Sequence, residues 1–442
     1  MAQAIAGPGR CSRHTTVLAT EGLHPMKNLH AALVAVLAML TGLPAAAQMP
    51  TARPEAVGMS SERLLRVDAW VARMQAEGKL AGAVTAVARR GQIVSLKAHG
   101  LADIETQRAM RFDDIFQIQS MSKPIAVVAV LMLLEEGRFL LSDPVAKFLP
   151  EFRGMLVAVA KADAPDGFVL VPAQRGITIH DLLTHRAGFT GLPSSNTPAE
   201  ALRRKAMQAL PANFDFSLEQ YVQNLAASPL ESQPGSVFKY GPSADVLGRL
   251  VEVVSGRSIA AFLSERIFQP LAMADTSFMV PADKHARVVS AYARSADKGL
   301  VKLQPYSLAP RFQSTSGNLF STAADYLRFC QMLLNGGELD GRRLLSRKSV
   351  ELMTARHLEA FPMAFMAGQH VGLGVAVRTA SGESGLIGSA GAYGWSGGYN
   401  TYFRIDPQEK LILIFMPQQQ FVPPDLELQS GFHNTAMQAL ND

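Results

Sequence analysis

The spacing of apolar residues near the N-terminus predicts a helix followed by two strands. Residues 60–80 place apolar side chains near helical spacing, behind a pair of serines that can act as a cap. Residues 81–100 then form two β-rich runs that meet at Arg90-Gly91, which is typical of a hairpin. This end of the chain therefore supplies a helix and two neighbouring strands.

The apolar spacing changes to a helical pattern in the middle of the chain and returns to a strand pattern near the C-terminus. Helical runs begin at Ser120, at Leu218 and near Ser243. Two strand-like runs, residues 401–406 and 411–416, flank a short Pro-Gln-Glu turn. The middle of the chain is therefore expected to be mostly helical.

Strands at both ends with helices between them favour one sheet assembled from the two ends of the chain. We expect an α/β (α+β) fold in which this antiparallel sheet is flanked by helices and carries an inserted, mostly helical lobe. The sheet lobe should span about residues 54–118 and 311–442, and the helical lobe about residues 119–310.

The first 47 residues have the pattern of a leader that is removed. Residues 26–47 combine a basic start, an apolar run and a small-residue Ala-Ala-Ala end, which is typical of a secretory signal peptide; residues 1–25 look like an upstream start. We therefore expect a mature domain of residues 48–442 in the periplasm or outside the cell. The apolar run is too short to span a bilayer comfortably, so no stable membrane span is expected after cleavage.

Composition argues against several classes of protein and of site. The chain is 48% hydrophobic, too apolar for disorder, and its formal charge of +5 is not gathered into a basic run that would bind nucleic acid. Only Cys330 remains beyond the leader, so no internal disulfide can form. His180 and His185 are spaced wrongly for a helical metal site. We expect no metal and no cofactor, and the oligomeric state is not indicated.

The stretch "FQIQSMSKPIAVVAVLMLLEEG" contains the first candidate for chemistry. Ser120 and Lys123 are spaced i, i+3, so at a helix start both side chains lie on one face within reach of each other. The helix behind them is apolar almost all round and should be buried, which desolvates the lysine and favours the neutral amine that can act as a base. Free N–H groups at the helix start would favour an oxyanion beside Ser120. The alternative is a serine cap with a solvated lysine.

Two further stretches carry candidate groups. Tyr240 precedes a Gly-Pro turn and could supply the second acid–base group beside a lysine. In "YGWSGGYNTYF", glycines surround Trp395 and Ser396 at a strand, where Gly397 would let a substrate approach closely and the N–H of Gly398 could complete an oxyanion hole.

Together, Ser120-x-x-Lys123, Tyr240 and Trp395-Ser396-Gly397 resemble the three-motif pattern of the serine β-lactamase and penicillin-binding-protein superfamily. The resemblance is greatest to class C β-lactamases and family VIII carboxylesterases, and it extends from about Pro54 to the C-terminus through stretches such as "ITIHDLLTHRAGF" and "YGPSADVLGRLVEVVSG". It implies a β-lactamase-like fold with the site between the two lobes. It also implies acylation of Ser120, proton transfer shared by Lys123 and Tyr240, and an oxyanion hole from the N–H groups of Ser120 and Gly398.

Two departures from that pattern change the expected substrate. Trp395 stands where related β-lactamases and peptidases carry a lysine that pairs with the substrate carboxylate, and an indole offers an apolar wall instead. Pro242 stands where an asparagine amide would hold a lactam side chain. We therefore expect a small-molecule ester or related acyl substrate, with Trp395, Ser396 and Gly397 lining its site.

Three other interpretations stay open at this stage. The same nucleophile could serve a β-lactamase or a D-Ala-D-Ala-type peptidase. A ligand-binding or sensor protein could keep the fold without turnover. Residues 394–398 also match G-x-S-x-G, the nucleophile elbow of α/β-hydrolases, which should turn from a strand into a helix and use Asp425 and His433 as later partners.

Overall fold

The computed structural model describes residues 49–191, 196–295, 299–359, 366–380, 382–422 and 426–442. The expected signal peptide, residues 26–47, lies outside these described residues. Within them, no helix combines the length and the apolar character that crossing a membrane requires.

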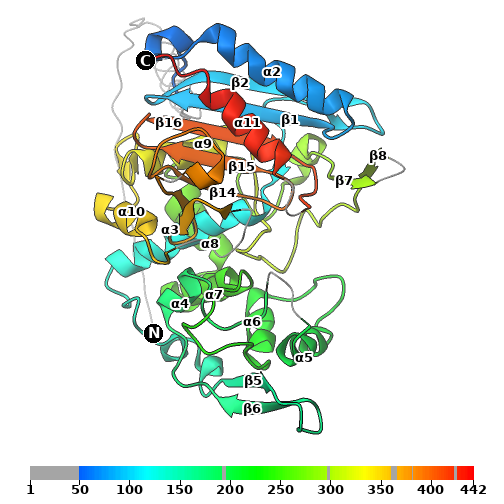
Figure 1. Ribbon diagram of the computed structural model, residues 1–442, viewed down its shortest axis with the longest axis vertical. Coiled ribbons are helices and arrows are strands. Elements are labelled where there is room, and N and C mark those ends of the chain that lie inside the picture. The colour runs from blue at the N-terminus through cyan, green and yellow to red at the C-terminus, as the bar shows by residue number, and fades with distance from the viewer. Residues whose placement is uncertain (1–48, 192–195, 296–298, 360–365, 381, 423–425) are drawn as a thin grey trace, which may run out of the picture. The chain divides into compact units, whose positions relative to one another are not determined.

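The centre of the fold is an eight-stranded antiparallel sheet in the order β12-β13-β14-β15-β16-β1-β2-β3 (Figure 1). Its strands are β1 (Gly82–Arg89), β2 (Gln92–Asp103), β3 (Arg108–Ala109), β12 (Gln369–Val371), β13 (Ala376–Arg378), β14 (Tyr393–Ser396), β15 (Tyr402–Asp406) and β16 (Leu411–Pro417). The two ends of the chain meet where β1 pairs with β16, from Ala83 opposite Pro417 to Arg89 opposite Leu411. This pairing confirms the expected sheet built from both chain ends, including the hairpin between β1 and β2.

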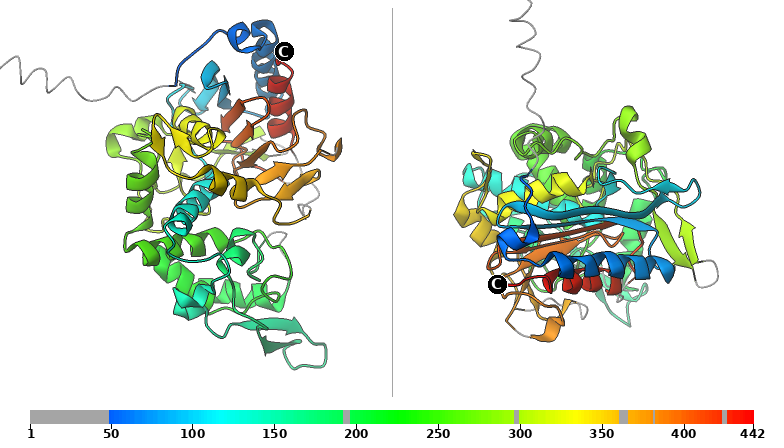
Figure 2. Two further views of the ribbon diagram at one scale, coloured as in Figure 1. Left: turned by 90° about the vertical axis from the view of Figure 1, so that its left-hand side faces the viewer. Right: turned by 90° about the horizontal axis from the view of Figure 1, so that it is seen from above.

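Helices cover both faces of the sheet because alternate strand residues point to opposite sides. On one face, α2 (Ser61–Ala76) and α11 (Glu427–Met437) lie side by side, as the blue and red helices of Figure 2 show. Phe415 of β16 packs there between Trp70 and Phe432, with ring centroids 5.8 and 5.1 Å away. On the other face, Phe403 of β15 packs on Tyr326 of α9 (Ala323–Leu334).

The helix α3 (Ser122–Glu135) connects this sheet region to a group of helices. The group is α4 (Ile179–Leu183), α5 (Pro198–Met207), α6 (Leu218–Ala226), α7 (Ser243–Ser255) and α8 (Ile259–Leu263). Every residue of α3 from Ser122 to Leu133 is buried, because the helix is apolar all round and packs against α7 and α8. The predicted burial of this helix is therefore confirmed.

Short elements complete the fold. The remaining strands and helices are β4 (Phe116–Gln117), β5 (Leu156–Ala160), β6 (Phe168–Pro172), β7 (Tyr292–Ser295), β8 (Gly299–Lys302), β9 (Phe320–Ser321), β10 (Glu338–Leu339), β11 (Arg342–Arg343) and α10 (Arg347–Thr354). The hairpin of β5 and β6 lies among the helices, and the sequence pattern did not predict it.

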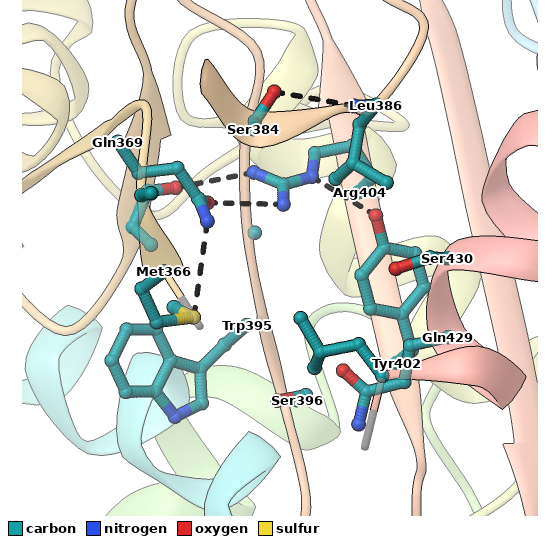
Figure 3. Close-up of a pocket in the computed structure, with 14 residues that line it drawn as sticks. Met366, Gln369, Ser384, Leu386, Trp395, Ser396, Tyr402, Arg404, Gln429 and Ser430 are labelled. Carbon is teal, nitrogen blue, oxygen red and sulfur yellow. Dashed lines mark hydrogen bonds between the residues drawn. The ribbon is translucent and has the colours of Figure 1, made fainter. Parts of the chain in front are cut away.

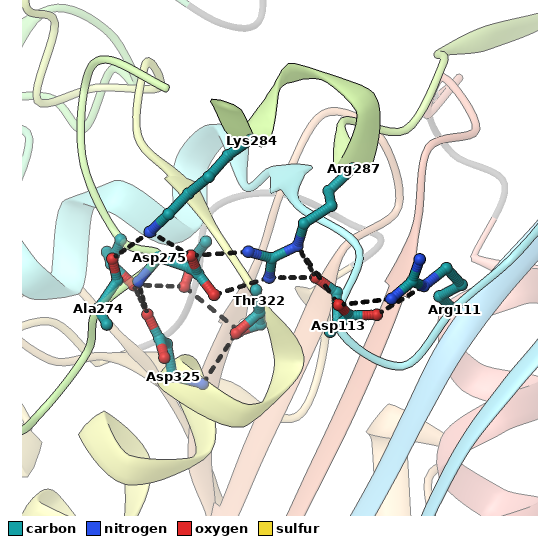
Figure 4. A network of polar contacts seen from close by, with 10 residues as sticks. Arg111, Asp113, Ala274, Asp275, Lys284, Arg287, Thr322 and Asp325 are labelled. Carbon is teal, nitrogen blue, oxygen red and sulfur yellow. Dashed lines mark hydrogen bonds and ion pairs between the residues drawn. The ribbon is translucent and has the colours of Figure 1, made fainter. Parts of the chain in front are cut away.

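An ion-pair network fixes the loops near the start of α9 (Figure 4). Asp275 accepts from Lys284 and Arg287, each at 2.7 Å, and Arg287 also donates to the backbone carbonyl of Asp113 at 2.9 Å. Asp325 accepts from the N–H of Asp275 at 2.7 Å, and burial raises its pKa to about 6. The network ties residues that are more than 150 positions apart in sequence.

A buried histidine in α11 makes stability depend on pH. His433 accepts from the hydroxyl of Tyr402 at 2.8 Å through Nδ1 and donates through Nε2 to the carbonyl of Ile387. Burial lowers its pKa to about 3, below the value of about 6.5 in an unfolded chain. The native state therefore binds this proton less tightly than the unfolded state, and the stabilisation present above pH 6.5 is lost as the pH falls.

We expect His433 to account for about 2.5 kcal/mol of lost stability between pH 7 and pH 4.5. The measurement is urea unfolding of the wild type and of His433→Gln at both pH values. Wild type should lose that much more than the variant over the interval, because glutamine does not titrate. An equal loss in the two proteins would contradict the assignment.

Candidate active site

Ser120 lies on a tight turn directly before α3. A single 3-10 turn spans Gln119–Met121, and α3 begins at Ser122. The expected helix start at Ser120 was therefore two residues early. Gln119 has φ 49°, a left-handed conformation that is unusual for a residue with a side chain, and Ser120 follows it half-exposed. The turn therefore places the serine at the N-terminal end of α3.

Lys123 faces Ser120 from the first turn of α3. Its Nζ lies 3.0 Å from Ser120 Oγ and donates at 2.7 Å to the carbonyl of Ser316, while the residue is only 4% exposed. The carbonyl of Ser316 thus holds the amine against the serine hydroxyl. The structure brings together the pair that the i, i+3 spacing predicted.

Tyr240 meets this pair with the face of its ring. Lys123 Nζ lies 4.6 Å from the ring centroid, a cation–π geometry. The hydroxyl of Tyr240 accepts from Nε1 of Trp395 at 3.4 Å, and the two rings lie 5.8 Å apart. Residues from three distant parts of the chain therefore surround one amine.

A buried carboxyl group lies beneath Lys123, and the sequence analysis did not identify it. Asp245 of α7 accepts from the hydroxyl of Ser314 at 2.7 Å and from the N–H and hydroxyl of Ser316 at 3.1 and 2.7 Å. Burial raises the pKa of Asp245, and the nearby charge of Lys123 opposes that rise. Asp245 thus positions Ser316, whose carbonyl accepts the hydrogen bond from Lys123. The only sequence signal was an acid on the apolar side of a helical run.

His185 is a second residue of the site that sequence reasoning did not assign. It lies two residues after the end of α4, and its ring centroid is 4.9 Å from that of Tyr240 and 5.7 Å from that of Phe238. Burial first, and then the charge of Lys123, lowers its pKa to about 3, so the ring against Tyr240 is a neutral imidazole. His180 instead contacts His357, with 3.0 Å between ring nitrogens.

The glycine-rich stretch brings the end of β14 against the Ser120 turn. Gly397 donates to the carbonyl of Thr401 at 2.7 Å, and a Cβ there would lie 2.1 Å from Thr401 Oγ1 and 2.5 Å from the carbonyl of Ile118. Only glycine allows this approach. Gly398 is exposed and lies next to Gln119. Within the described residues its N–H donates to no acceptor, so it is available to an oxyanion.

The structure contradicts the nucleophile-elbow interpretation of residues 394–398. β14 turns into another strand, with Ser396 opposite Tyr402 in β15, whereas an elbow needs a following helix. Both ring nitrogens of His433 are bonded to other groups, and Asp425 lies outside the described residues. Among the described residues, no three His, Cys, Asp or Glu side chains are grouped to hold a metal ion.

Comparison with known proteins assigns the family. The Beta-lactamase family model matches residues 67–432. Protein Rv1367c of Mycobacterium tuberculosis is 35% identical over 369 residues, which cover 80% of this chain and 89% of that protein. Esterase EstB of Burkholderia gladioli is 38% identical over 214 residues, 48% of this chain and 51% of that protein.

Solved structures agree on the fold. Simvastatin synthase (LovD) from Aspergillus terreus has a TM-score of 0.73 at 20% identity, covering 86% of this chain and 98% of that one. EstCE1, a hydrolase with promiscuous acyltransferase activity, has a TM-score of 0.72 at 24% identity, covering 85% and 99%. With the family match and the esterase relative, these likenesses lead to one conclusion: this chain belongs to the Beta-lactamase family and is a serine hydrolase.

Proposed function

We propose that this protein cleaves carboxylic esters through an acyl-enzyme on Ser120. The observation that carries the proposal is the 3.0 Å contact between Lys123 Nζ and Ser120 Oγ, in a site where position 395, which donates to the Tyr240 hydroxyl, holds an indole and not a cation. A serine needs a neighbouring base to become a nucleophile, and this amine is the group in contact with its hydroxyl.

The proposed mechanism uses the groups that surround Ser120. Ser120 Oγ attacks the ester carbonyl while the amine of Lys123 accepts its proton and keeps its donation to Ser316. The face of Tyr240 and the carboxyl of Asp245 favour the resulting ammonium. The N–H groups of Ser120 and Gly398 hold the oxyanion, and the proton passes through the Tyr240 hydroxyl to the departing alcohol. Water then attacks the acyl-enzyme by the reverse proton path and releases the acid.

An ester fits the wall formed by Trp395 better than a lactam does. The indole ring of Trp395 lies 5.8 Å from the Tyr240 ring and the residue is half-buried, so it offers an apolar surface to an uncharged acyl or alcohol group. Relatives named for ester cleavage support this choice, among them Esterase EstB and the Lovastatin esterase of Penicillium rubens, which is 30% identical over 64% of this chain.

A peptidase or lactamase with the same nucleophile is the second candidate. It is favoured by relatives named Penicillin-binding protein 4, from Amycolatopsis lactamdurans, and putative D-alanyl-D-alanine carboxypeptidase, from Escherichia coli, at 28% and 25% identity. Such substrates carry a carboxylate, and a neutral indole at position 395 cannot pair with it.

We expect kcat/KM for p-nitrophenyl butyrate to exceed that for nitrocefin by about 100-fold or more, because losing a charge partner typically costs 2–5 kcal/mol. Both substrates are measured on one preparation, with release of D-alanine from a D-Ala-D-Ala peptide as the third arm. Equal or higher kcat/KM for the lactam or the peptide would contradict the ester assignment. Absence of a burst and of fluorophosphonate labelling at Ser120 would favour a binding protein.

We also propose export, on the pattern of residues 26–47. An intact mass of the extracytoplasmic protein that starts at Gln48 would support it, and a cytoplasmic protein retaining residues 26–47 would contradict it.

A further inference from the structure

A small cavity adjoins the candidate active site on the α11 side of the sheet (Figure 3). It is lined by Trp395 and Ser396 of β14, Tyr402 and Arg404 of β15, and Gln429 and Ser430 of α11, among others. Its volume is about 40 Å³, and one water needs about 10–15 Å³ by the same measure. The cavity therefore has room for about three water-sized groups, which is the size of a carboxylate.

The charged group in this lining is Arg404, which is 6% exposed. Its guanidinium donates to the hydroxyl of Tyr402 at 3.1 Å, to the carbonyl of Ala376 at 3.4 Å and to Oε1 of Gln369 at 3.2 Å. All three acceptors are uncharged, and two of the five N–H donors stay unused. In the part of the chain that the structure describes, Arg404 forms no ion pair. Its Cζ also lies 5.7 Å from the centroid of the Tyr402 ring, but none of the described residues gives the guanidinium an ionic partner. A buried charge without an ionic partner is strongly unfavourable, so an anion in the cavity would be favoured.

The neighbouring charges do not neutralise Arg404. Arg378 lies close enough that burial, and then the charge of Arg404, lowers its pKa. The charge of Asp406 partly opposes this fall in the pKa of Arg378. Its carboxylate accepts from the backbone N–H groups of Ser389, Gln408 and Glu409. Opposite Arg404 on β14 is Gly394, which has no side chain to offer an acid. Among the described residues, the charge of Asp406 acts on Arg378 and its oxygens accept from backbone N–H groups, so the positive charge of Arg404 remains beside the cavity.

Polar donors around the cavity suit an anion. Among the described residues, the amide Nε2 of Gln369 donates only to the sulfur of Met366, at 3.8 Å, and sulfur is a weak acceptor. Figure 3 shows Gln369, Arg404 and Ser430 around the same space, with Trp395 closing its lower side. Helix α11 begins beside it at Glu427 without a side-chain cap, so its first-turn N–H groups also favour negative charge.

We infer that this cavity binds a carboxylate carried by the substrate at a distance from the scissile ester bond. The inference rests on the proposed ester hydrolysis and names its substrate class: monoesters of dicarboxylic acids, or esters whose alcohol bears a carboxylate. Trp395 lines the cavity and also donates to the hydroxyl of Tyr240, so the cavity and the candidate active site share this side chain. Arg404 thereby supplies a cation at a position different from the one that Trp395 occupies.

The kinetic test compares charged and uncharged esters of equal length. The acyl arm uses the mono-p-nitrophenyl esters of glutaric and adipic acid against p-nitrophenyl valerate and hexanoate. The alcohol arm uses 4-carboxyphenyl butyrate against 4-carbamoylphenyl butyrate. In wild type, kcat/KM for the charged member of one arm should be at least about 10-fold higher, and the arm that shows it locates the carboxylate. No preference in either arm would overturn the inference, and this result needs no variant.

The variant test uses Arg404→Met, which keeps an unbranched apolar stem and removes the guanidinium with its charge. KM for the preferred charged ester should rise about 10- to 100-fold. KM for the uncharged ester should stay within about two-fold of the wild-type value. Arg404→Lys should recover part of the loss in KM for the charged ester. Equal losses on both esters would assign Arg404 a structural role only.

A binding measurement separates this inference from the proposed function. Glutarate is titrated calorimetrically into Ser120→Ala and into the double variant Ser120→Ala/Arg404→Met. Binding that depends on Arg404 supports the cavity even if no ester is hydrolysed, in which case the proposed function fails alone. Ester hydrolysis without charge preference and without glutarate binding overturns the cavity alone.

Discussion

Ser120→Ala should abolish hydrolysis of p-nitrophenyl butyrate, with a loss in kcat of about 10⁴-fold or more. Ser120 Oγ is the hydroxyl in contact with Lys123, and alanine removes the only atom that can form the proposed acyl-enzyme. The measurement is initial rate against enzyme concentration, with mass spectrometry of the protein after reaction with a fluorophosphonate. The label should add to wild type and not to the variant.

Ser396→Ala is the matched control, because it removes a second half-exposed hydroxyl from the same region. Ser396 pairs with Tyr402 across two strands and is not followed by a helix, so its replacement should leave a measurable rate. If Ser396→Ala abolished activity and Ser120→Ala retained it, the nucleophile would lie in β14.

Lys123→Met should lower kcat/KM by about 10²- to 10⁴-fold, the usual contribution of a positioned general base. Methionine occupies similar space in the buried position but cannot accept the proton of Ser120. It also leaves the carbonyl of Ser316 without its donor and the carboxyl of Asp245 without a nearby cation. The measurements are kcat/KM across pH and near-ultraviolet circular dichroism as a check of folding.

Asp245→Asn is the companion variant for Lys123. The Oδ1 of asparagine can still accept from the Ser314 hydroxyl and the Ser316 N–H, but the side chain carries no charge, so the variant separates the position of the lysine from its electrostatic environment. A folded Lys123→Met protein with activity within about 10-fold of wild type would show that another group accepts the proton.

Much of the fold could be predicted from local patterns. The 3.6-residue period marks α2, which buries one face, and short β-rich runs mark β1, β2, β15 and β16, of which β1, β15 and β16 are buried throughout. These elements lie where the patterns indicate. The start of α3 was two residues early, because the 3-10 turn at Gln119 leaves no signal in hydrophobicity. The β5–β6 hairpin also escaped prediction, since its residues are only partly buried and show no clean alternation.

Part of the candidate site could likewise be predicted from the sequence, and part could not. Ser120 and Lys123 are three residues apart, so helical geometry alone predicts their contact. Asp245, Ser316 and His185 reach the site from distant segments, and no spacing in the chain links them to Lys123. The catalytic roles of Ser120, Lys123, Tyr240 and Gly398 remain predictions that the experiments above test.

The sequence by itself determined the order of helices and strands, the Ser120–Lys123 pair and the family pattern, because these depend on periodicity and on short separations along the chain. Only the tertiary structure decided that Lys123 meets the ring of Tyr240, that Asp245 holds the carbonyl beneath the lysine, and that Arg404 faces a cavity beside Trp395. Those relations arise where packing brings remote segments together, and burial then changes the charge balance of groups whose neighbours a linear pattern does not reveal.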